Sequence, residues 1–245
     1  MDTIGILGAG AMGSGIAQVA AAAGHKVVLC DNLTIALSKA SKGIQASMKT
    51  LTERGKISDS DAYSLFSRIQ FADHMSQFRD CTMVIEAIQE DIEQKQIAFK
   101  SMEAIVAESA ILASNTSSLS ISAMGAQLRH PERILGVHFF NPAPLMRLVE
   151  IIPALQTTAE VVERGKKLID NWGKVTVIAK DTPGFIVNRV ARPYYGEALR
   201  MLDEGIADIA TIDWAMRDLA GFRMGPFELM DFIGNDINYA VTEVV

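Results

Sequence analysis

A histidine and a glutamate stand on two apolar segments that lie close together in the chain. His138 ends the run Ile134–Val137, and Glu150 lies within Leu148–Ile152. Imidazole titrates close to neutral pH, so a histidine can accept a proton from an alcohol while a hydride leaves the same carbon. A carboxylate among apolar neighbours is costly to bury unless it has a partner, and a partner imidazole would be oriented by it. The pair therefore predicts His138 as a general base and Glu150 as its orienting carboxylate.

Both residues also have plainer interpretations, in which His138 is a structural histidine and Glu150 faces solvent or pairs with Arg147. Two more polar residues, Ser117 after a predicted strand and Asn188 near the start of a predicted helix, could bind a substrate oxygen. Each is more often a helix cap or a locally bonded side chain, so they are candidates only in combination with His138 and Glu150. We expect the remaining histidines, His25, His74 and His130, at the surface.

The N-terminal residues carry a glycine pattern that is typical of dinucleotide-binding loops. The apolar segment Thr3–Leu7 precedes Gly8-Ala9-Gly10-Ala11-Met12-Gly13, and helix-forming residues follow as far as Ala23. In such a loop the first glycine permits a tight turn, the second admits a pyrophosphate and the third lets the helix pack closely on the strand. The helix N-terminus then faces the phosphates. The predicted cofactor-binding residues of this loop are Gly8, Gly10, Met12 and Gly13.

The acid after the second apolar segment indicates which dinucleotide binds. Lys26–Cys30 is followed by Asp31, 23 residues after Gly8, where a carboxylate can bind the adenosine ribose hydroxyls. This position favours NAD over NADP. The segment Ile4–Gly24 contains no charged residue and has the length of a membrane span, but its glycines and the absence of a basic flank favour a buried strand and helix.

Composition excludes several classes of function. The 245 residues are 49% hydrophobic with a net charge of −6, and the pI is about 5.3. Such a chain can bury a large core, and it has no broad basic field, so we expect no nucleic-acid partner and no membrane association. Cys30 and Cys81 lack metal-ligand spacing, and the chain does not begin with a secretory segment. We expect no metal, reduced thiols and a cytoplasmic location.

Apolar and amphipathic segments alternate through most of the chain. The further predicted strands are Ile69–Ala72, Thr82–Ala87, Ile111–Ser114, Ile134–His138, Leu148–Ile152 and Lys174–Ile178. The predicted helices after the glycine loop are Thr34–Arg54, Asp59–Phe66, Asp91–Glu108 and Thr158–Trp172. This pattern predicts an α/β fold in which a doubly wound, mostly parallel sheet has helices on both faces and the later strands are mixed in direction. We assign residues 1–182 to this Rossmann-type domain.

The pattern becomes helical after Asp181. Thr182 is predicted to cap a long helix that has Pro183 in its first position, a kink at Pro193 and its end near Glu204. Further helices are predicted over Asp208–Leu219 and Pro226–Val245. We therefore expect a smaller, all-helical domain over residues 183–245. Its sequence stops inside an apolar pattern without a capping signal, so we expect that domain to be incomplete and the chain to be a fragment.

In combination, these motifs resemble the L-3-hydroxyacyl-CoA dehydrogenase family. Besides the glycine loop and Asp31, the resemblance rests on Val84–Glu90 with Lys95, Ser114–Leu119, His138–Pro142, Leu148–Glu150, Lys180–Arg189 and Met224–Leu229. It implies reversible oxidation of a (3S)-3-hydroxyacyl-CoA to the 3-ketoacyl-CoA by NAD, a reaction of fatty-acid β-oxidation. By this resemblance His138 is the general base and Glu150 orients it, while Ser117 and Asn188 hold the substrate oxygen and the catalytic water or histidine.

The resemblance also implies where the two ends of the substrates bind. Glu90, Lys95, Ser117 and Asn141 are expected near the nicotinamide, and the helical excursion after the second strand is expected to contribute Ser47, Arg54 and Lys56 to the CoA site. Thr50 stands where the family often has lysine, so the individual phosphate contacts stay open, and a solvated basic helix face is the alternative. The helical domain carries the dimer contacts in this family, which implies a homodimer if that domain is complete.

Within the family, Phe139–Met146 and Asn188–Ala198 resemble bacterial enzymes that act on 3-hydroxybutyryl-CoA or on 3-hydroxyadipyl-CoA. We favour short-chain substrates such as 3-hydroxybutyryl-CoA, and 3-hydroxyadipyl-CoA of phenylacetate breakdown is the alternative, with Arg192 as a candidate cation for its far carboxylate. A dehydrogenase of the 6-phosphogluconate type would need a lysine where Asn188 stands. A non-catalytic NAD-binding protein would keep the fold without the chemistry.

Overall fold

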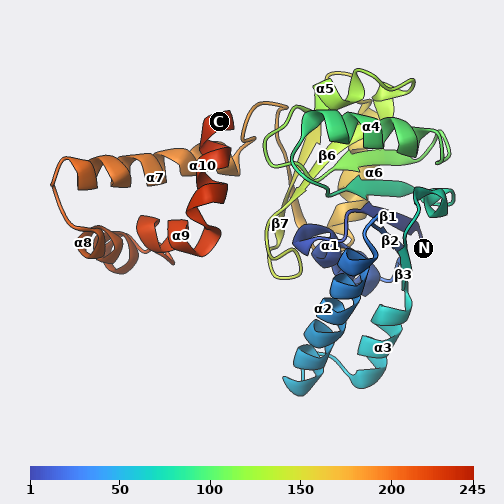
Figure 1. Cartoon of the computed structure of the whole chain (residues 1–245), viewed down its shortest axis with the longest axis horizontal. Coiled ribbons are helices and arrows are strands. Elements are labelled where there is room, and N and C mark those ends of the chain that lie inside the picture. Colours follow the sequence, from blue (N-terminus) through green and yellow to red (C-terminus); the bar gives the residue numbers. More distant parts are fainter. The chain divides into compact units, whose positions relative to one another are not determined.

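The computed structural model describes residues 1–245 apart from the side chain of Val244. It divides the chain into two compact units, Met1–Asp181 and Thr182–Val245 (Figure 1). This division lies one residue before the boundary that we expect from the sequence. The first unit contains the sheet and the second unit is helical.

An eight-stranded sheet forms the centre of the first unit. Its strands are β1 (Thr3–Leu7), β2 (Lys26–Cys30), β3 (Ile69–Ala72), β4 (Met83–Glu86), β5 (Ile111–Ser114), β6 (Ile134–Phe139), β7 (Leu148–Pro153) and β8 (Val175–Ile178). Their spatial order is β3-β2-β1-β4-β5-β6-β7-β8, and neighbouring strands are parallel except for β6 and β7. The order reverses between β1 and β4, and dinucleotides bind at such a switch point in doubly wound folds. The prediction of a Rossmann-type sheet with mixed later strands is confirmed.

Helices cover both faces of this sheet (Figure 1). On one face lie α1 (Ala11–Ala22) and α6 (Ala159–Asp170), and on the other lie α4 (Ile92–Glu103) and α5 (Ile121–Gly125). Successive residues of β6 point to opposite faces of the sheet. Val137 belongs to the core under α1 and α6, whereas Gly136 lies against Ile121 of α5. His138 has the parity of Gly136 and therefore faces the α5 side of the sheet.

The predicted helical excursion after β2 is a hairpin of α2 (Thr34–Glu53) and α3 (Asp59–Ser67), which extends beyond the sheet (Figure 1). Leu37, Ala40, Ile44 and Met48 bury one face of α2. Ser58 caps α3 and forms a capping box with Asp61. The segment Ile4–Gly24 contains α1 and all but the first residue of β1, as we expect from its glycines. None of the helices that the structure describes is both long and apolar enough to span a bilayer.

The sequence pattern misses three short elements of the first unit: α5 and the 3₁₀ turns η1 (Met75–Phe78) and η2 (Pro131–Arg133). Each has five residues or fewer and so shows no helical periodicity.

The expectation that His25 lies at the surface is wrong. His25 is 8% exposed, its ring lies beside Trp172 and its Nδ1 accepts the Asp2 N–H, so it is a core histidine.

The second unit is helical, as we expect. Its helices are α7 (Val187–Asp203), α8 (Ile209–Trp214) with the π-helical turn η3 (Ala215–Leu219), α9 (Pro226–Ile233) and α10 (Asn235–Val244). Their packed side chains include Tyr195, Ala198, Ile212, Phe227 and Met230. The expected helix over Pro226–Val245 is interrupted at Gly234, whose φ of 97° is left-handed.

The predicted cap at Thr182 is wrong. Gly184 and Phe185 have φ angles of 72° and 48°, so the backbone turns before the helix begins at Val187. The Phe185 N–H donates to Thr182 O at 3.0 Å, which closes that turn. Glycine accepts a left-handed conformation easily and phenylalanine does not, so residue propensity alone favours the helical start that we predict.

Candidate active site

The glycine loop lies at the switch point between β1 and β4. Gly8 has a φ of 105°, and a Cβ on it would lie 2.5 Å from Ala87 O. A Cβ on Gly13 would lie 1.8 Å from Gly8 O, so both positions require glycine. By contrast, a Cβ on Gly10 meets no protein atom within 4 Å. The open space at Gly10 beside the N-terminus of α1 fits the pyrophosphate of a dinucleotide. Met12 lies in the first turn of α1, partly buried on the core.

Asp31 follows β2 at the same edge of the sheet. Its Oδ2 accepts the Ala9 N–H at 2.8 Å, and its Oδ1 accepts the Leu33 N–H at 2.9 Å. The half-buried carboxylate thus braces the glycine loop, and it lies after the second strand, where doubly wound dinucleotide-binding folds commonly have the acid for the ribose. The sequence motif indicates the ribose contact but not the bond to Ala9.

The structure brings His138 and Glu150 together. They are register partners in the antiparallel pair of β6 and β7, and His138 Nδ1 lies 2.7 Å from Glu150 Oε2. The two residues are 5% and 0% exposed, so Glu150 does not face solvent, and it has His138 as a partner. An ionised carboxylate can only accept a hydrogen bond, so Nδ1 carries the proton and Nε2 carries the lone pair. The ring of Phe140 lies beside the imidazole, with 4.5 Å between centroids.

The loop after β6 contacts the glycine-loop helix α1. Lys174 Nζ donates to Ala143 O at 2.6 Å and to Met146 O at 2.8 Å, and burial lowers the pKa of Lys174. A Cβ on Gly15 of α1 would lie 3.2 Å from Ala143 Cβ. The loop therefore packs on the first turns of α1, and it carries the exposed Asn141 at its start.

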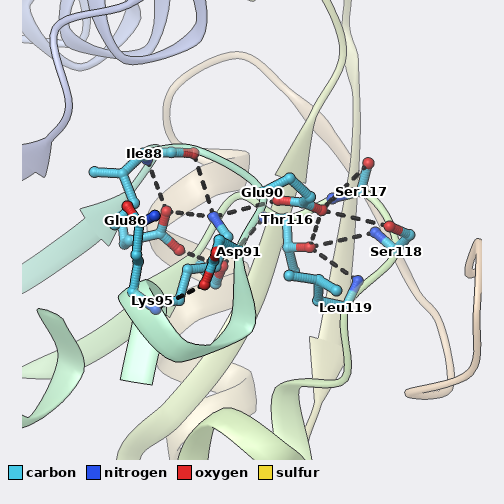
Figure 2. A network of polar contacts seen from close by, with 11 residues as sticks. Glu86, Ile88, Glu90, Asp91, Lys95, Thr116, Ser117, Ser118 and Leu119 are labelled. Carbon is cyan, nitrogen blue, oxygen red and sulfur yellow. Dashed lines mark hydrogen bonds and ion pairs between the residues drawn. The ribbon is translucent and has the colours of Figure 1, made fainter. Parts of the chain in front are cut away.

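A polar network joins the ends of β4 and β5 (Figure 2). Lys95, on α4, donates to Glu86 Oε1 at 2.5 Å and to Ile88 O at 3.4 Å. Its Nζ also lies 3.3 Å from Glu90 Oε2. Lys95 is 1% exposed and Glu86 is 0% exposed, so this is a buried ion pair. The three N–H donors of the ammonium thus match three protein oxygens.

Glu90 connects this network to the loop that carries Ser117. Its Oε1 accepts the Ser117 N–H at 3.1 Å, and the hydroxyl of Thr116 also donates to it (Figure 2). Burial acts to raise the pKa of the Glu90 carboxyl, but the charge of Lys95 and the bond from Thr116 outweigh it, and the pKa is lowered. Glu90 therefore contacts both Lys95 and the backbone of Ser117.

Sequence reasoning missed Glu86 and Thr116. A usable signal existed for Glu86, because a carboxylate at the end of an apolar strand needs a partner just as Glu150 does. No such signal marked Thr116, because threonine is common in polar loops.

The residues expected at CoA lie on the α2–α3 hairpin. Ser47 is half-buried, and its Oγ accepts from Gln18 of α1 at 3.3 Å. Arg54 directly follows α2, and Lys56 lies in the turn to α3, both exposed. Ser47 stands about two helical turns before them, so the structure places the three residues along one hairpin.

Asn188 and Arg192 belong to the second unit. Asn188 is the second residue of α7, and its backbone O accepts from Arg192 Nε at 3.2 Å. Arg192 Nη1 donates to Asn238 Oδ1 and to Thr242 Oγ1, both at 2.8 Å, and its guanidinium lies 4.9 Å from the centre of the Tyr195 ring. These contacts occupy Arg192 within the helical unit, which weakens its candidacy for a substrate carboxylate.

Within the part of the chain that the structure describes, no cluster of three or more His, Cys, Asp or Glu residues could hold a metal ion. Cys30 and Cys81 are buried free thiols. Burial, aided by Asp31, raises the pKa of Cys30 to about 11. Burial, aided by Asp80, raises the pKa of Cys81 to about 12.

Comparisons with known protein families match both units. Residues 3–182 match the NAD-binding domain of 3-hydroxyacyl-CoA dehydrogenase. Residues 184–245 match the C-terminal domain of the same family. The predicted family and its cofactor, NAD, are therefore confirmed.

Individual relatives agree with this family assignment. The chain is 46% identical to 3-hydroxyadipyl-CoA dehydrogenase of Escherichia coli over 99% of its own length, and it spans about half (51%) of that protein. It is 43% identical to the mitochondrial hydroxyacyl-coenzyme A dehydrogenase of Sus scrofa, covering 94% of this chain and 76% of the relative. The crystal structure of (S)-3-hydroxybutyryl-CoA dehydrogenase from Ralstonia eutropha superimposes with a TM-score of 0.96 at 38% identity, covering 100% and 86% of the two chains. The chain belongs to the 3-hydroxyacyl-CoA dehydrogenase family, a family of NAD-dependent oxidoreductases.

Proposed function

We propose that this chain catalyses the reversible oxidation of a (3S)-3-hydroxyacyl-CoA to the 3-ketoacyl-CoA with NAD. The observation that carries the proposal is the buried pair of His138 and Glu150, 2.7 Å apart, in the sheet that also presents the glycine loop. A non-catalytic NAD-binding protein would have no use for a histidine held in one tautomer by a buried carboxylate.

In the proposed reaction, His138 Nε2 takes the proton of the substrate 3-hydroxyl. When bound, NAD supplies the acceptor for the hydride that leaves C3. The O–H and C–H bonds break and the C3–O double bond forms, so proton and electron pair are both accounted for. Glu150 keeps its bond to Nδ1 and stabilises the imidazolium. In the reverse direction His138 returns the proton to the oxygen.

Several other residues receive roles from the family resemblance. We propose that Ser117 binds the substrate oxygen and that Asn188 holds that oxygen, the catalytic water or His138. The support for Ser117 is its position on a loop that Glu90 and Thr116 hold in place. Glu90, Lys95 and Asn141 are proposed at the nicotinamide end, and Ser47, Arg54 and Lys56 at the CoA.

The proposed substrate is short, such as 3-hydroxybutyryl-CoA, by similarity to the (S)-3-hydroxybutyryl-CoA dehydrogenase of Ralstonia eutropha. The second candidate is 3-hydroxyadipyl-CoA, which the name of the Escherichia coli relative favours. Comparing kcat/KM for the two substrates decides between them. A homodimer and a cytoplasmic location are further proposals, which gel filtration and cell fractionation test.

The decisive experiment measures the loss of NADH absorbance with acetoacetyl-CoA for the parent and for His138→Gln. We expect the variant to lose at least about a hundredfold in turnover with nearly unchanged NADH affinity, because only the base is removed. Near-normal turnover in His138→Gln would remove His138 from the mechanism. NADH binding without turnover in the parent would instead support the non-catalytic alternative.

A further inference from the structure

Glu86 is a buried carboxylate to which the proposed reaction gives no role. It ends β4, directly between Leu7 of β1 and Ser114 of β5 in the sheet register. Its Oε1 accepts from Lys95 Nζ and from the Ile88 N–H at 2.7 Å, and its Oε2 accepts from Ser114 Oγ at 2.7 Å. A buried ion pair adds little stability over a well-packed apolar pair, so Glu86 calls for an explanation other than stability.

Two chains of contacts lead from Glu86 to the loop that carries Thr116 and Ser117. The first runs through Ser114, whose Oγ donates to Glu86 and accepts the Thr116 N–H at 3.1 Å. The second runs through Lys95, which lies 3.3 Å from Glu90 Oε2, while Glu90 Oε1 accepts the Ser117 N–H at 3.1 Å. Both routes end on the same loop, so Glu86 is connected to it by two separate sets of contacts.

The charges show what Glu86 contributes. Lys95 is a buried ammonium shared by two carboxylates, and Glu86 is the nearer of them, at 2.5 Å against 3.3 Å for Glu90. Glu90 has one oxygen, Oε2, on Lys95 and the other, Oε1, on the loop. If Glu86 were neutral, Lys95 would draw the whole Glu90 carboxylate toward itself, and the Ser117 N–H would lose its acceptor.

We propose that Glu86 is a positioning residue that holds the Ser117 loop in place by competing with Glu90 for Lys95 and by binding Ser114. The inference rests on the proposed function, since it gives Ser117 its task at the substrate oxygen. In this positioning role, Glu86 itself touches neither substrate nor cofactor.

A double-mutant cycle between Glu86→Gln and Ser117→Ala tests the proposal. Glutamine keeps the shape of Glu86 and removes its charge. We expect Glu86→Gln to lower kcat by about 10- to 100-fold, as is typical for residues that orient a site, with less than about a threefold change in KM for acetoacetyl-CoA. In the Ser117→Ala background the same change is expected to lower kcat by less than about threefold, because the group that it positions is absent.

The matched control is Glu160→Gln, the same chemical change at a side chain that is 80% exposed on α6. We expect it to leave kcat unchanged in both backgrounds. Equal losses from Glu86→Gln with and without Ser117, or no loss at all, would overturn the positioning role. If Glu86→Gln does not fold, Ser114→Ala replaces it in the cycle, with a loss of about threefold that likewise disappears beside Ser117→Ala.

Hydrogen exchange gives a readout that needs no activity. The Ser117 N–H is bonded to Glu90, and the Ser118 and Leu119 N–H groups are bonded to Thr116 Oγ1. We expect Glu86→Gln to raise exchange at these three amides by about tenfold and Glu160→Gln to leave it unchanged. Unchanged exchange in Glu86→Gln overturns the inference. If Glu86→Gln raises exchange at these amides but the parent chain shows no dehydrogenase activity, the positioning of the loop is supported and only the proposed function is overturned.

Discussion

Glu150 Oε2 lies 2.7 Å from His138 Nδ1 because the two residues are directly opposite each other in the antiparallel pair of β6 and β7. Opposite residues in such a pair project from the same face of the sheet, so strand register sets the distance. A slip of one residue would place Glu150 on the other face. The acid and the base are therefore positioned by the pairing of two strands of the sheet.

Glu150→Gln is expected to lower kcat by about a hundredfold or more, because an amide does not stabilise the imidazolium and can donate to Nδ1, which moves the lone pair to the wrong nitrogen. Steady-state kinetics with NADH and acetoacetyl-CoA measure the loss. NADH affinity, measured by fluorescence titration, should change by less than about twofold. A kcat within about threefold of the parent would show that His138 does not depend on this carboxylate.

Two alanine substitutions in the glycine loop should differ in their effects on stability and on NADH binding. Gly13→Ala places a Cβ 1.8 Å from Gly8 O and is expected to lower the free energy of unfolding by about 2 kcal/mol or more. Gly10→Ala meets no protein atom within 4 Å, so it should leave stability unchanged and weaken NADH binding by at least about tenfold. Thermal unfolding and NADH titration of both variants separate the effects. Equal NADH affinity in Gly10→Ala and the parent would place the dinucleotide elsewhere.

Asp31→Ala is expected to weaken NADH binding and to relax discrimination against NADPH. The ribose would lose its acceptor, and the Ala9 N–H would lose the bond of 2.8 Å that braces the loop. Asp31→Asn separates the two causes, because its side-chain oxygen can still accept from Ala9 while the charge is gone. Titrations with both dinucleotides measure the change. Unaltered affinity and selectivity in Asp31→Ala would refute the ribose assignment.

The parts of the fold that follow from local sequence could be predicted. The glycine loop, Asp31 and the alternation of strands and helices each depend on neighbouring residues, and they specify the Rossmann-type sheet. His138 and Glu150 could be paired because both interrupt apolar strands. Their direct opposition could not be derived, since it needs the direction of β7 relative to β6, which no local pattern gives.

Other features depend on contacts between distant residues or on backbone angles. Glu86 meets Lys95 only because β4 and α4 pack together, and Ser114 reaches Glu86 only through strand register. The start of α7 depends on a left-handed Phe185, which opposes the propensity of that residue. Such features arise from tertiary packing, which overrides the local preferences that a sequence reveals.

The acid stability of the first unit should depend on Glu90. Burial acts to raise the pKa of Glu90, but Lys95 and the bond from Thr116 prevail, so the folded pKa lies below the ordinary value of 4.5. The unfolded chain therefore binds the proton more readily than the folded chain does. The contribution of ionised Glu90 to stability is fully present above the ordinary pKa and is lost as the pH falls through the lowered folded pKa. Glu90→Gln carries no such titration.

The expected result is a free-energy difference between the parent and Glu90→Gln that is constant from about pH 7 down to about pH 5 and shrinks below about pH 4. Urea unfolding at a series of pH values measures it, followed by the fluorescence of Trp172 in a Trp214→Phe background so that only the first unit is observed. A difference between the parent and Glu90→Gln that persists undiminished to about pH 3 would mean that the folded carboxylate is not stabilised by Lys95 and Thr116.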